Sequence, residues 1–155
     1  MSLYNNGITI KLGRPKMGDI KVKVHLENDG DVFMYKEGKI KKQEIRKVEI
    51  DALVDTGAVM VLLPQDVVEA LGLAKIDRAI VPLANEEKVE LDVAGTVSLT
   101  LMNRKMKTDC LIGPPQCEPL IGQLVLERLD LILDPLKRTI TARPESPYVP
   151  SLKLK

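Results

Sequence analysis

The chain has 155 residues and a mass of 17.2 kDa, and its 23 Lys and Arg against 22 Asp and Glu leave a formal net charge of +1 at pH 7. This length fits one compact domain, and the balanced charge argues against a polyanion binder that works by bulk electrostatics. Hydrophobic residues make up 45% of the chain and aromatic residues only 3%, so we expect an aliphatic core without aromatic platforms for nucleic-acid bases.

The sequence also bears on location and redox state. No apolar run approaches the roughly 20 residues of a membrane-spanning helix, and the opening residues lack the basic and apolar regions of a signal peptide. We therefore expect a soluble, cytoplasmic protein with no membrane partner. Cys110 and Cys117 match no zinc or redox spacing, and we expect two reduced thiols there, although a disulfide is sterically conceivable.

Alternating apolar and polar residues predict strands over 20–26 and 48–54, with a turn at 27–30 between them. His25, the only histidine, falls on the lysine side of the first strand. A solvent-facing position there argues against a His-based hydrolase or metal site. Residues 36–47 are rich in Lys and Arg and are interpreted as a solvated hairpin with a turn at 37–38, with an anionic partner as the alternative.

Two segments carry helix signals. Residues 64–71 have Pro near the start, an acid in the first turn and Gly72 behind, and residues 123–129 follow a glycine. Between them, residues 89–101 are predicted as two strands with Gly95 as a bend or bulge. A hairpin is expected over 131–141, and the Pro-rich tail 144–155 is interpreted as an irregular or docking arm.

The segment that points to chemistry is 52–58, where an apolar strand runs into Asp55, Thr56 and Gly57. This order presents a carboxylate in a tight turn at the end of a strand. Further along, Pro-Leu-Ile-Gly at 119–122 leads into the second helix. Each motif alone has an ordinary explanation, a hairpin turn capped by Asp55 or a glycine before a helix, but their order and spacing are harder to explain without a function.

Together these motifs resemble those of the retropepsin-like aspartic proteases, over residues from about 20 to 140. Residues 53–58 are similar to the catalytic loop of that family, 120–122 to its apolar-apolar-Gly motif, and 81–87 fall at its flap hairpin. The resemblance implies an all-β fold, mainly antiparallel and closed like a barrel, with one or two short helices. It also implies a single domain over 1–155 and chemistry without metal or cofactor.

The family hydrolyses peptides with two carboxylates, one taking a proton from water and the other donating one to the carbonyl oxygen. Because no second Asp-Thr-Gly or Asp-Ser-Gly occurs in this chain, the resemblance implies a homodimer in which two copies of Asp55 meet on the two-fold axis. The catalytic residues would be Asp55, Thr56 and Gly57, with Thr56 bonding to the opposite loop. Substrate would contact Ala58, Leu83, Ala84, Asn85, Ile121 and Gly122.

Three features depart from the family pattern. Asn85, Glu86 and Glu87 stand where the flap usually carries glycine, Val59 and Gln123 stand where retroviral members have an acid and an arginine, and the insertion 27–47 is long. None of these departures removes a catalytic atom, so the sequence favours an aspartic endopeptidase that works best at acidic pH. The alternative is a catalytically weak peptide-binding dimer of the same fold. A third hypothesis is a basic hairpin that contacts nucleic acid or an acidic protein.

Overall fold

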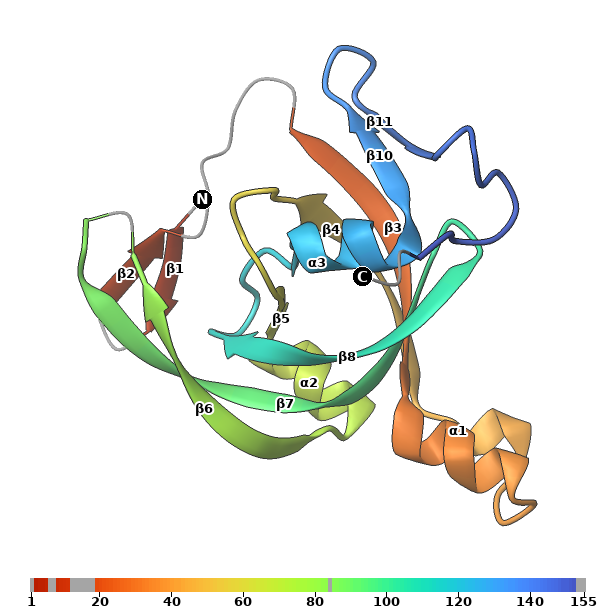
Figure 1. The fold of residues 1–155 in the computed structure, drawn as a ribbon. Coiled ribbons are helices and arrows are strands. Elements are labelled where there is room, and N and C mark those ends of the chain that lie inside the picture. Colours follow the sequence, from red (N-terminus) through yellow and green to blue (C-terminus); the bar gives the residue numbers. More distant parts are fainter. Residues whose placement is uncertain (1, 6–7, 12–18, 84, 153–155) are drawn as a thin grey trace.

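The computed structural model describes residues 2–5, 8–11, 19–83 and 85–152. Within them, seven strands form one sheet in the order β3 (Ile20–Asn28), β4 (Lys47–Val54), β9 (Leu120–Ile121), β5 (Val61–Pro64), β8 (Arg104–Gly113), β7 (Lys88–Leu101) and β6 (Ala74–Pro82). Because β3 also pairs with β7, the strands from β3 to β7 close into a ring, and β6 extends it along β7 (Figure 1).

Two hairpins stand outside this sheet, β1 (Ser2–Asn5) with β2 (Ile8–Lys11) and β10 (Leu131–Asp134) with β11 (Thr139–Ala142). Most pairings in the sheet are antiparallel, with β4–β9 and β5–β8 parallel. The predicted all-β fold class and the predicted hairpin over 131–141 are confirmed. None of the helices in the described ranges combines the length and apolarity that crossing a membrane requires.

Alternation explains how the outer strands pack. In β3, Ile20, Val24 and Leu26 are buried, whereas Lys23 and His25 are exposed, which confirms the solvent-facing position predicted for His25. The short strand β5 is instead buried along its whole length, as expected for a strand flanked on both sides and covered on both faces. The main core joins these strands to the buried faces of two helices.

Those two helices lie where local signals predicted them. Helix α2 (Gln65–Leu71) follows Pro64 and ends at Gly72, whose φ of 64° is the left-handed conformation that glycine adopts without strain. Helix α3 (Gln123–Leu129) begins after Gly122 and buries Val125, Leu126 and Leu129. The predicted range 123–129 is confirmed, and the first range differs by one residue.

The segment between β3 and β4 contradicts the prediction. Instead of a turn at 27–30 and a hairpin over 36–47, it forms α1 (Asp29–Lys36) and a 3-10 helix, η1 (Lys42–Glu44). The turn predicted at 37–38 lies between them and is confirmed. The prediction of one or two short helices was therefore too low for the described residues. The Asn28 side chain caps α1 by accepting a hydrogen bond from the Asp31 N–H at 3.0 Å, so the Asp-Gly pair at 29–30 opens a helix rather than a turn.

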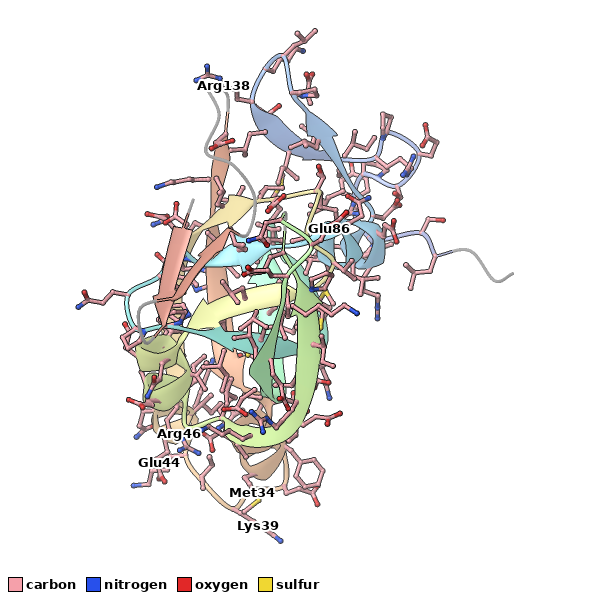
Figure 2. The ribbon with its side chains drawn as sticks, turned by 90° about the vertical axis from the view of Figure 1, so that its left-hand side faces the viewer. Met34, Lys39, Glu44, Arg46, Glu86 and Arg138 are labelled. Carbon is pink, nitrogen blue, oxygen red and sulfur yellow. The ribbon has the colours of Figure 1, made fainter. Side chains whose placement is uncertain are left out.

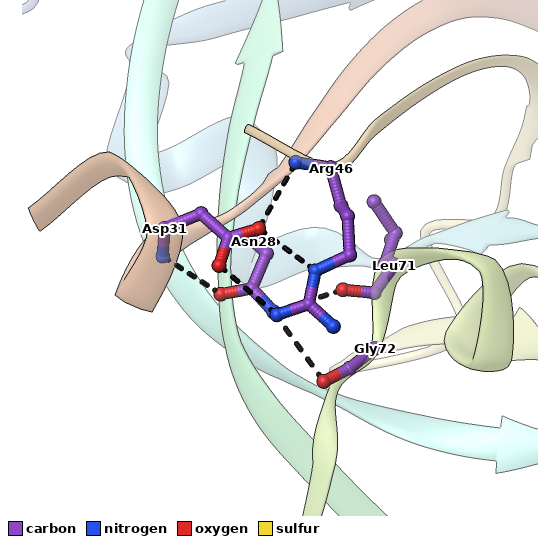
Figure 3. Close-up of polar contacts among 5 residues, drawn as sticks. All are labelled: Asn28, Asp31, Arg46, Leu71 and Gly72. Atoms are coloured by element: carbon purple, nitrogen blue, oxygen red, sulfur yellow. Dashed lines mark hydrogen bonds and ion pairs between the residues drawn. The ribbon is translucent and has the colours of Figure 1, made fainter. Parts of the chain in front are cut away.

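A polar network holds α1 in place (Figure 3). Asn28 Nδ2 donates to the carbonyl of Leu71 at 2.8 Å and to that of Gly72 at 3.3 Å, at the end of α2. The Asp31 carboxylate accepts from Arg46 Nε at 2.8 Å, from Arg46 Nη2 at 3.0 Å and from the Arg46 N–H at 3.0 Å. These contacts join the end of β3, α1, the start of β4 and the end of α2.

The mid-chain strand also differs from the prediction. Residues 89–101 belong to one continuous strand, β7, rather than to two. Its pairing with β8 shifts register between Ala94 and Val97, which confirms a bulge at Gly95. The bulge bends β7 without ending it, so one strand can pair with β6 and β8 along its length and with β3 near its end.

The segment after β11 is fastened through Asp130, which is 6% exposed. Its carboxylate accepts from Arg143 Nε at 2.7 Å, from the Ser151 N–H at 3.1 Å and from the Ser146 hydroxyl. Arg104, 4% exposed, donates to the carbonyls of Leu129 and Asp130 at 2.7 and 3.1 Å. Its positive charge there interacts favourably with the negative, C-terminal end of the α3 dipole.

This network makes the stability depend on pH. Hydrogen bonds from Ser146, then from Arg143 and Ser151, lower the pKa of Asp130 from 3.8 to about 2. Because the pKa is lower in the folded state, the contribution of Asp130 is complete above pH 3.8 and is lost as the pH falls towards about 2. Asp130→Asn should therefore lower the denaturation midpoint at pH 6, and its deficit relative to the wild type should shrink over that acidic range.

Denaturant titrations at several pH values measure this difference. Asp77→Asn is the matched control, because Asp77 is an exposed acid whose hydrogen bond reaches only the N–H of its neighbour Arg78. A deficit for Asp130→Asn that stays constant down to pH 2 would contradict the assigned role of the Asp130 carboxylate.

Candidate active site

Asp55 follows directly after the last residue of β4. Beyond the strand, the Asp55 N–H donates to the carbonyl of Ile121 at 3.0 Å, and the Leu53 N–H donates to that of Pro119 at 2.9 Å. These bonds continue the parallel pairing of Leu53 with Leu120 and of Val54 with Ile121. The two motifs that lie far apart in the sequence are thus hydrogen-bonded neighbours, and the apolar-apolar-Gly segment fixes the place where β4 releases the acid.

The loop turns tightly around the Asp55 carboxylate. Asp55 Oδ1 accepts from the Gly57 N–H at 2.9 Å, and the Asp55 carbonyl accepts from the Ala58 N–H at 3.0 Å. No other described residue donates to the carboxylate, so Oδ2 is open. Asp55 is half-buried, and Thr56 and Gly57 are exposed. The turn therefore aims one oxygen at its own backbone and leaves the other available.

Gly122 passes very close to the back of this loop. A Cβ at position 122 would lie 2.5 Å from the carbonyl oxygen of Val59 and 2.7 Å from that of Met60. Beyond it, the Gln123 N–H donates to Ala58 at 2.8 Å and the Leu124 N–H to Val59 at 3.3 Å. The first N–H groups of α3 are thereby satisfied by the loop, and only glycine allows the approach.

A cavity of about 560 Å³ opens beside Asp55. The loop, β5, the β6–β7 hairpin and the neighbouring strands line it with Asp55, Gly57, Ala58, Val59, Met60, Leu62, Ala79, Ile80, Val81, Pro82, Leu83, Leu111 and Leu120. Asp55 is the one ionisable residue in this set. The arrangement is an apolar pocket with a single carboxylate at its wall, which suits a ligand with an apolar side chain and a polar group placed near the acid.

The predicted site residues fall into three groups. Asp55, Gly57, Ala58 and Leu83 line the cavity. Thr56 and Gly122 belong to the loop and to the segment behind it. Asn85 lies on the exposed turn of the β6–β7 hairpin, Ile121 is 1% exposed within the main core, and Ala84 lies outside the described residues.

Some lining residues were not predicted, among them Leu120, Ala79 and Met60. Leu120 and Ile121 are consecutive in β9, and consecutive strand residues face opposite sides. Strand geometry sets the two side chains on opposite sides, but only the packing of β9 between β4 and β5 determines which one meets the cavity. At 79–83 the sequence is apolar throughout and all five residues line the cavity, so no alternation in the sequence could have indicated one lining face.

The turn of the β6–β7 hairpin has a residue that departs from the family pattern. The Leu83 N–H donates to Glu87 at 2.7 Å, and the Glu86 N–H donates to Leu83 at 3.0 Å. Glu86 has a φ of 69°, a conformation that glycine adopts at lower cost. Its charged side chain is exposed on this hairpin (Figure 2), so the turn combines a strained backbone position with an acidic surface.

Other chemistries find little support in the described residues. Cys110 and Cys117 are free, and burial raises the pKa of each thiol to about 12, so both are protonated and unreactive at neutral pH. His25 Nε2 lies 2.7 Å from a carboxylate oxygen of the exposed Glu49. In the part of the chain that the structure describes, no three His, Cys, Asp or Glu residues gather as metal ligands would.

Residues 42–128 match the family model described as "gag-polyprotein putative aspartyl protease". The chain belongs to this family. The match includes the loop at Asp55, the β6–β7 hairpin and the segment at Gly122, the parts that build the cavity wall. No curated protein matches the chain.

Two solved structures are similar to this member of the gag-polyprotein aspartyl protease family. The retroviral protease-like domain of Ddi1 from Leishmania major is 16% identical, with a TM-score of 0.51, over 83% of this chain and 91% of that domain. The EIAV protease in complex with the inhibitor HBY-793 is 21% identical, with a TM-score of 0.45, over 52% of this chain and 76% of that one. The Ddi1 domain establishes that the chain has a retroviral protease-like fold.

The approach of Gly122 to the loop can be tested by substitution. In Gly122→Ala the new Cβ would overlap the Val59 carbonyl oxygen, so we expect the loop or α3 to shift and the free energy of unfolding to fall by roughly 1–3 kcal/mol. Val59→Ala, the control, trims an exposed side chain from the same contact and should change stability by less than about 0.5 kcal/mol. Equal stability of Gly122→Ala and wild type in urea unfolding would contradict the close packing.

Proposed function

We propose that the protein is an aspartic endopeptidase that hydrolyses peptide bonds with a water molecule held between the Asp55 carboxylates of a homodimer. The observation that carries this proposal is the loop at Asp55. It presents an open carboxylate oxygen beside an apolar cavity, in a chain that belongs to an aspartyl protease family.

The proposed reaction uses the two acids in opposite protonation states. The ionised Asp55 takes a proton from the water as its oxygen attacks the peptide carbonyl carbon, and the protonated Asp55 of the second copy donates its proton to the carbonyl oxygen. The Asp55 that took the proton from water then donates it to the amide nitrogen, while the other Asp55 removes a proton from a gem-diol hydroxyl, and the C–N bond breaks. The products are a carboxyl and an amine, so the proton inventory balances without a metal or covalent intermediate.

A dimer is required because one chain supplies one such loop. Residues 56 and 57 are exposed in the single chain, and Thr56 makes no hydrogen bond to another described side chain. These properties are those of a surface available to a second copy, in which the Thr56 hydroxyl would bond to the opposite loop. We propose that this pairing holds the two carboxylates close enough to share one proton.

The cavity suggests how substrate would lie. Its aliphatic lining would accept an apolar side chain next to the cleaved bond. The β6–β7 hairpin would act as a flap, with Leu83 against the substrate and Asn85 at the turn. Roles for Ala84, Ile121 and Gly122 as substrate contacts stay predictions, as do the absence of a cofactor and the cytoplasmic location.

The first test replaces the acid while keeping its shape. Asp55→Asn retains an acceptor for the Gly57 N–H but cannot act as a base, so cleavage of an unstructured peptide at pH 3–6 should fall by at least about 10²-fold. Asp51→Asn, on an exposed acid of the same strand, should cleave at the wild-type rate. Full activity of Asp55→Asn would refute the mechanism, provided that both variants keep the wild-type circular dichroism spectrum.

The second test concerns the dimer. Thr56→Val removes the hydroxyl from both copies, and the loss of two hydrogen bonds should raise the dimer dissociation constant by about tenfold or more. Thr56→Ser keeps the hydroxyl and should dimerise like the wild type. Sedimentation equilibrium measures the constants, and specific activity should decline on dilution along the same curve. Activity that is independent of concentration in a monomeric sample would rule out a shared site.

A second candidate is a peptide-binding dimer with the same fold and little turnover. The observation that favours it is the left-handed, charged Glu86 at the turn of the hairpin that would have to close over substrate. A purified dimer that binds peptides from a library, and cleaves none between pH 3 and 7, would support this candidate over the endopeptidase.

A further inference from the structure

The connection between β3 and β4 is much longer than their pairing requires. The strands pair up to Glu27 and Lys47, and a turn of about two residues can close such a pair. Residues 29–45, which we call the α1 arm, instead project from the end of the sheet (Figure 1). β4 runs from this end towards Asp55, and its eight residues span about 23 Å between the arm and the acid.

The α1 arm holds apolar side chains in solvent. No residue of α1 is buried, and Phe33, Met34 and Tyr35 are 59%, 37% and 40% exposed. Phe33 is the only phenylalanine of the chain. An eight-residue helix with no buried side gains little from packing and is too short to be stable alone. The contacts of Asn28, Asp31 and Arg46 supply that stability instead.

The arm also carries cations without counterions. The exposed side chains of Lys36, Lys39, Lys41 and Lys42 form no ion pair with any described residue and fall within one seven-residue stretch, 36–42. Other described lysines without an ion pair are spread over different elements: Lys47, Lys88, Lys105 and Lys137. The turn at 37–38 brings an exposed apolar residue next to one of the lysines of the arm, since the Lys39 N–H donates to the carbonyl of Met34 at 2.9 Å. Figure 2 shows both residues at the same tip of the molecule.

Two of the four acids of the arm are paired with cations outside it. Asp31 is paired with Arg46, Asp29 Oδ2 lies 3.5 Å from Lys107 Nζ, and a Glu44 carboxylate oxygen accepts from the Lys41 N–H at 3.3 Å. Glu37 is the remaining acid of the arm. The exposed surface therefore combines apolar groups with four lysines against the carboxylates of Glu37 and Glu44, so it carries an excess of positive charge on a fixed support.

We propose that the α1 arm is a docking surface for an acidic protein segment that carries apolar side chains. Its carboxylates would lie against Lys36, Lys39, Lys41 and Lys42, and its apolar groups would cover Phe33, Met34 and Tyr35. Charge complementarity selects this partner. A nucleic acid fits less well, because its regular array of phosphates would meet Glu37 and Glu44 among the lysines. A peptide can instead place its carboxylates at the lysines and uncharged groups at those two positions. The proposal is independent of catalysis at Asp55, since the two surfaces lie at opposite ends of β4.

Fluorescence anisotropy with synthetic peptides tests the proposal on the full chain. The probe is a labelled peptide of Glu, Leu and Phe, compared with the same peptide in which each Glu is Gln and with a labelled oligothymidylate. We expect saturable binding of the acidic peptide, weaker by about tenfold or more for the Gln peptide, and reduced by added salt. No saturable binding, equal affinity for both peptides, or preferred binding of the oligonucleotide would overturn the proposal.

Two pairs of substitutions test whether the acidic peptide binds to the α1 arm. Phe33→Ser with Tyr35→Ser, and separately Lys39→Glu with Lys42→Glu, should each weaken binding of the acidic peptide by about tenfold. The matched control is Lys137→Glu with Arg138→Glu, exposed cations on the β10–β11 turn, where Arg138 lies at the opposite end of the molecule (Figure 2). Because all these side chains are exposed, the unfolding midpoints should stay unchanged. Equal losses in the control and arm variants would contradict the assignment.

Discussion

The contact between the loop after β4 and the backbone around Gly122 is the constraint on which the candidate site depends. Four hydrogen bonds between main-chain groups join the two segments, and the β4–β9 pairing and the start of α3 fix both sides of the contact. A side chain at position 122 would separate them. The orientation of Asp55 is thus a property of the backbone, and the acid needs no neighbouring side chain to hold it.

This arrangement explains why some of the site could be predicted from the sequence. The order Asp-Thr-Gly after an apolar strand, and apolar-apolar-Gly before a helix, are local patterns with local consequences. The same holds for α2 and α3, whose limits follow from Pro64, Gly72 and Gly122. Where local sequence signals and tertiary contacts favour the same structure, the sequence is sufficient to predict that structure.

The rest depended on contacts between distant residues. Helix α1 has a capping asparagine in the sequence, but its competing signal, Asp-Gly, is typical of turns, and the decision rests with Arg46 and the end of α2. The cavity lining was uncertain for a similar reason. Leu120 and Ile121 are both aliphatic, and nothing in their identities tells which side of a two-residue strand faces the open space.

The side chain of Asn28 has two tasks, because its oxygen opens α1 while its nitrogen closes α2. Because of this double use, a change in the α1 arm affects the end of α2. A relative that joined the same strands by a tight hairpin would lose the donor that satisfies the carbonyl of Leu71. It would then need a water, a different side chain or a reshaped helix end in its place, so loop shortening and changes at the end of α2 should occur together.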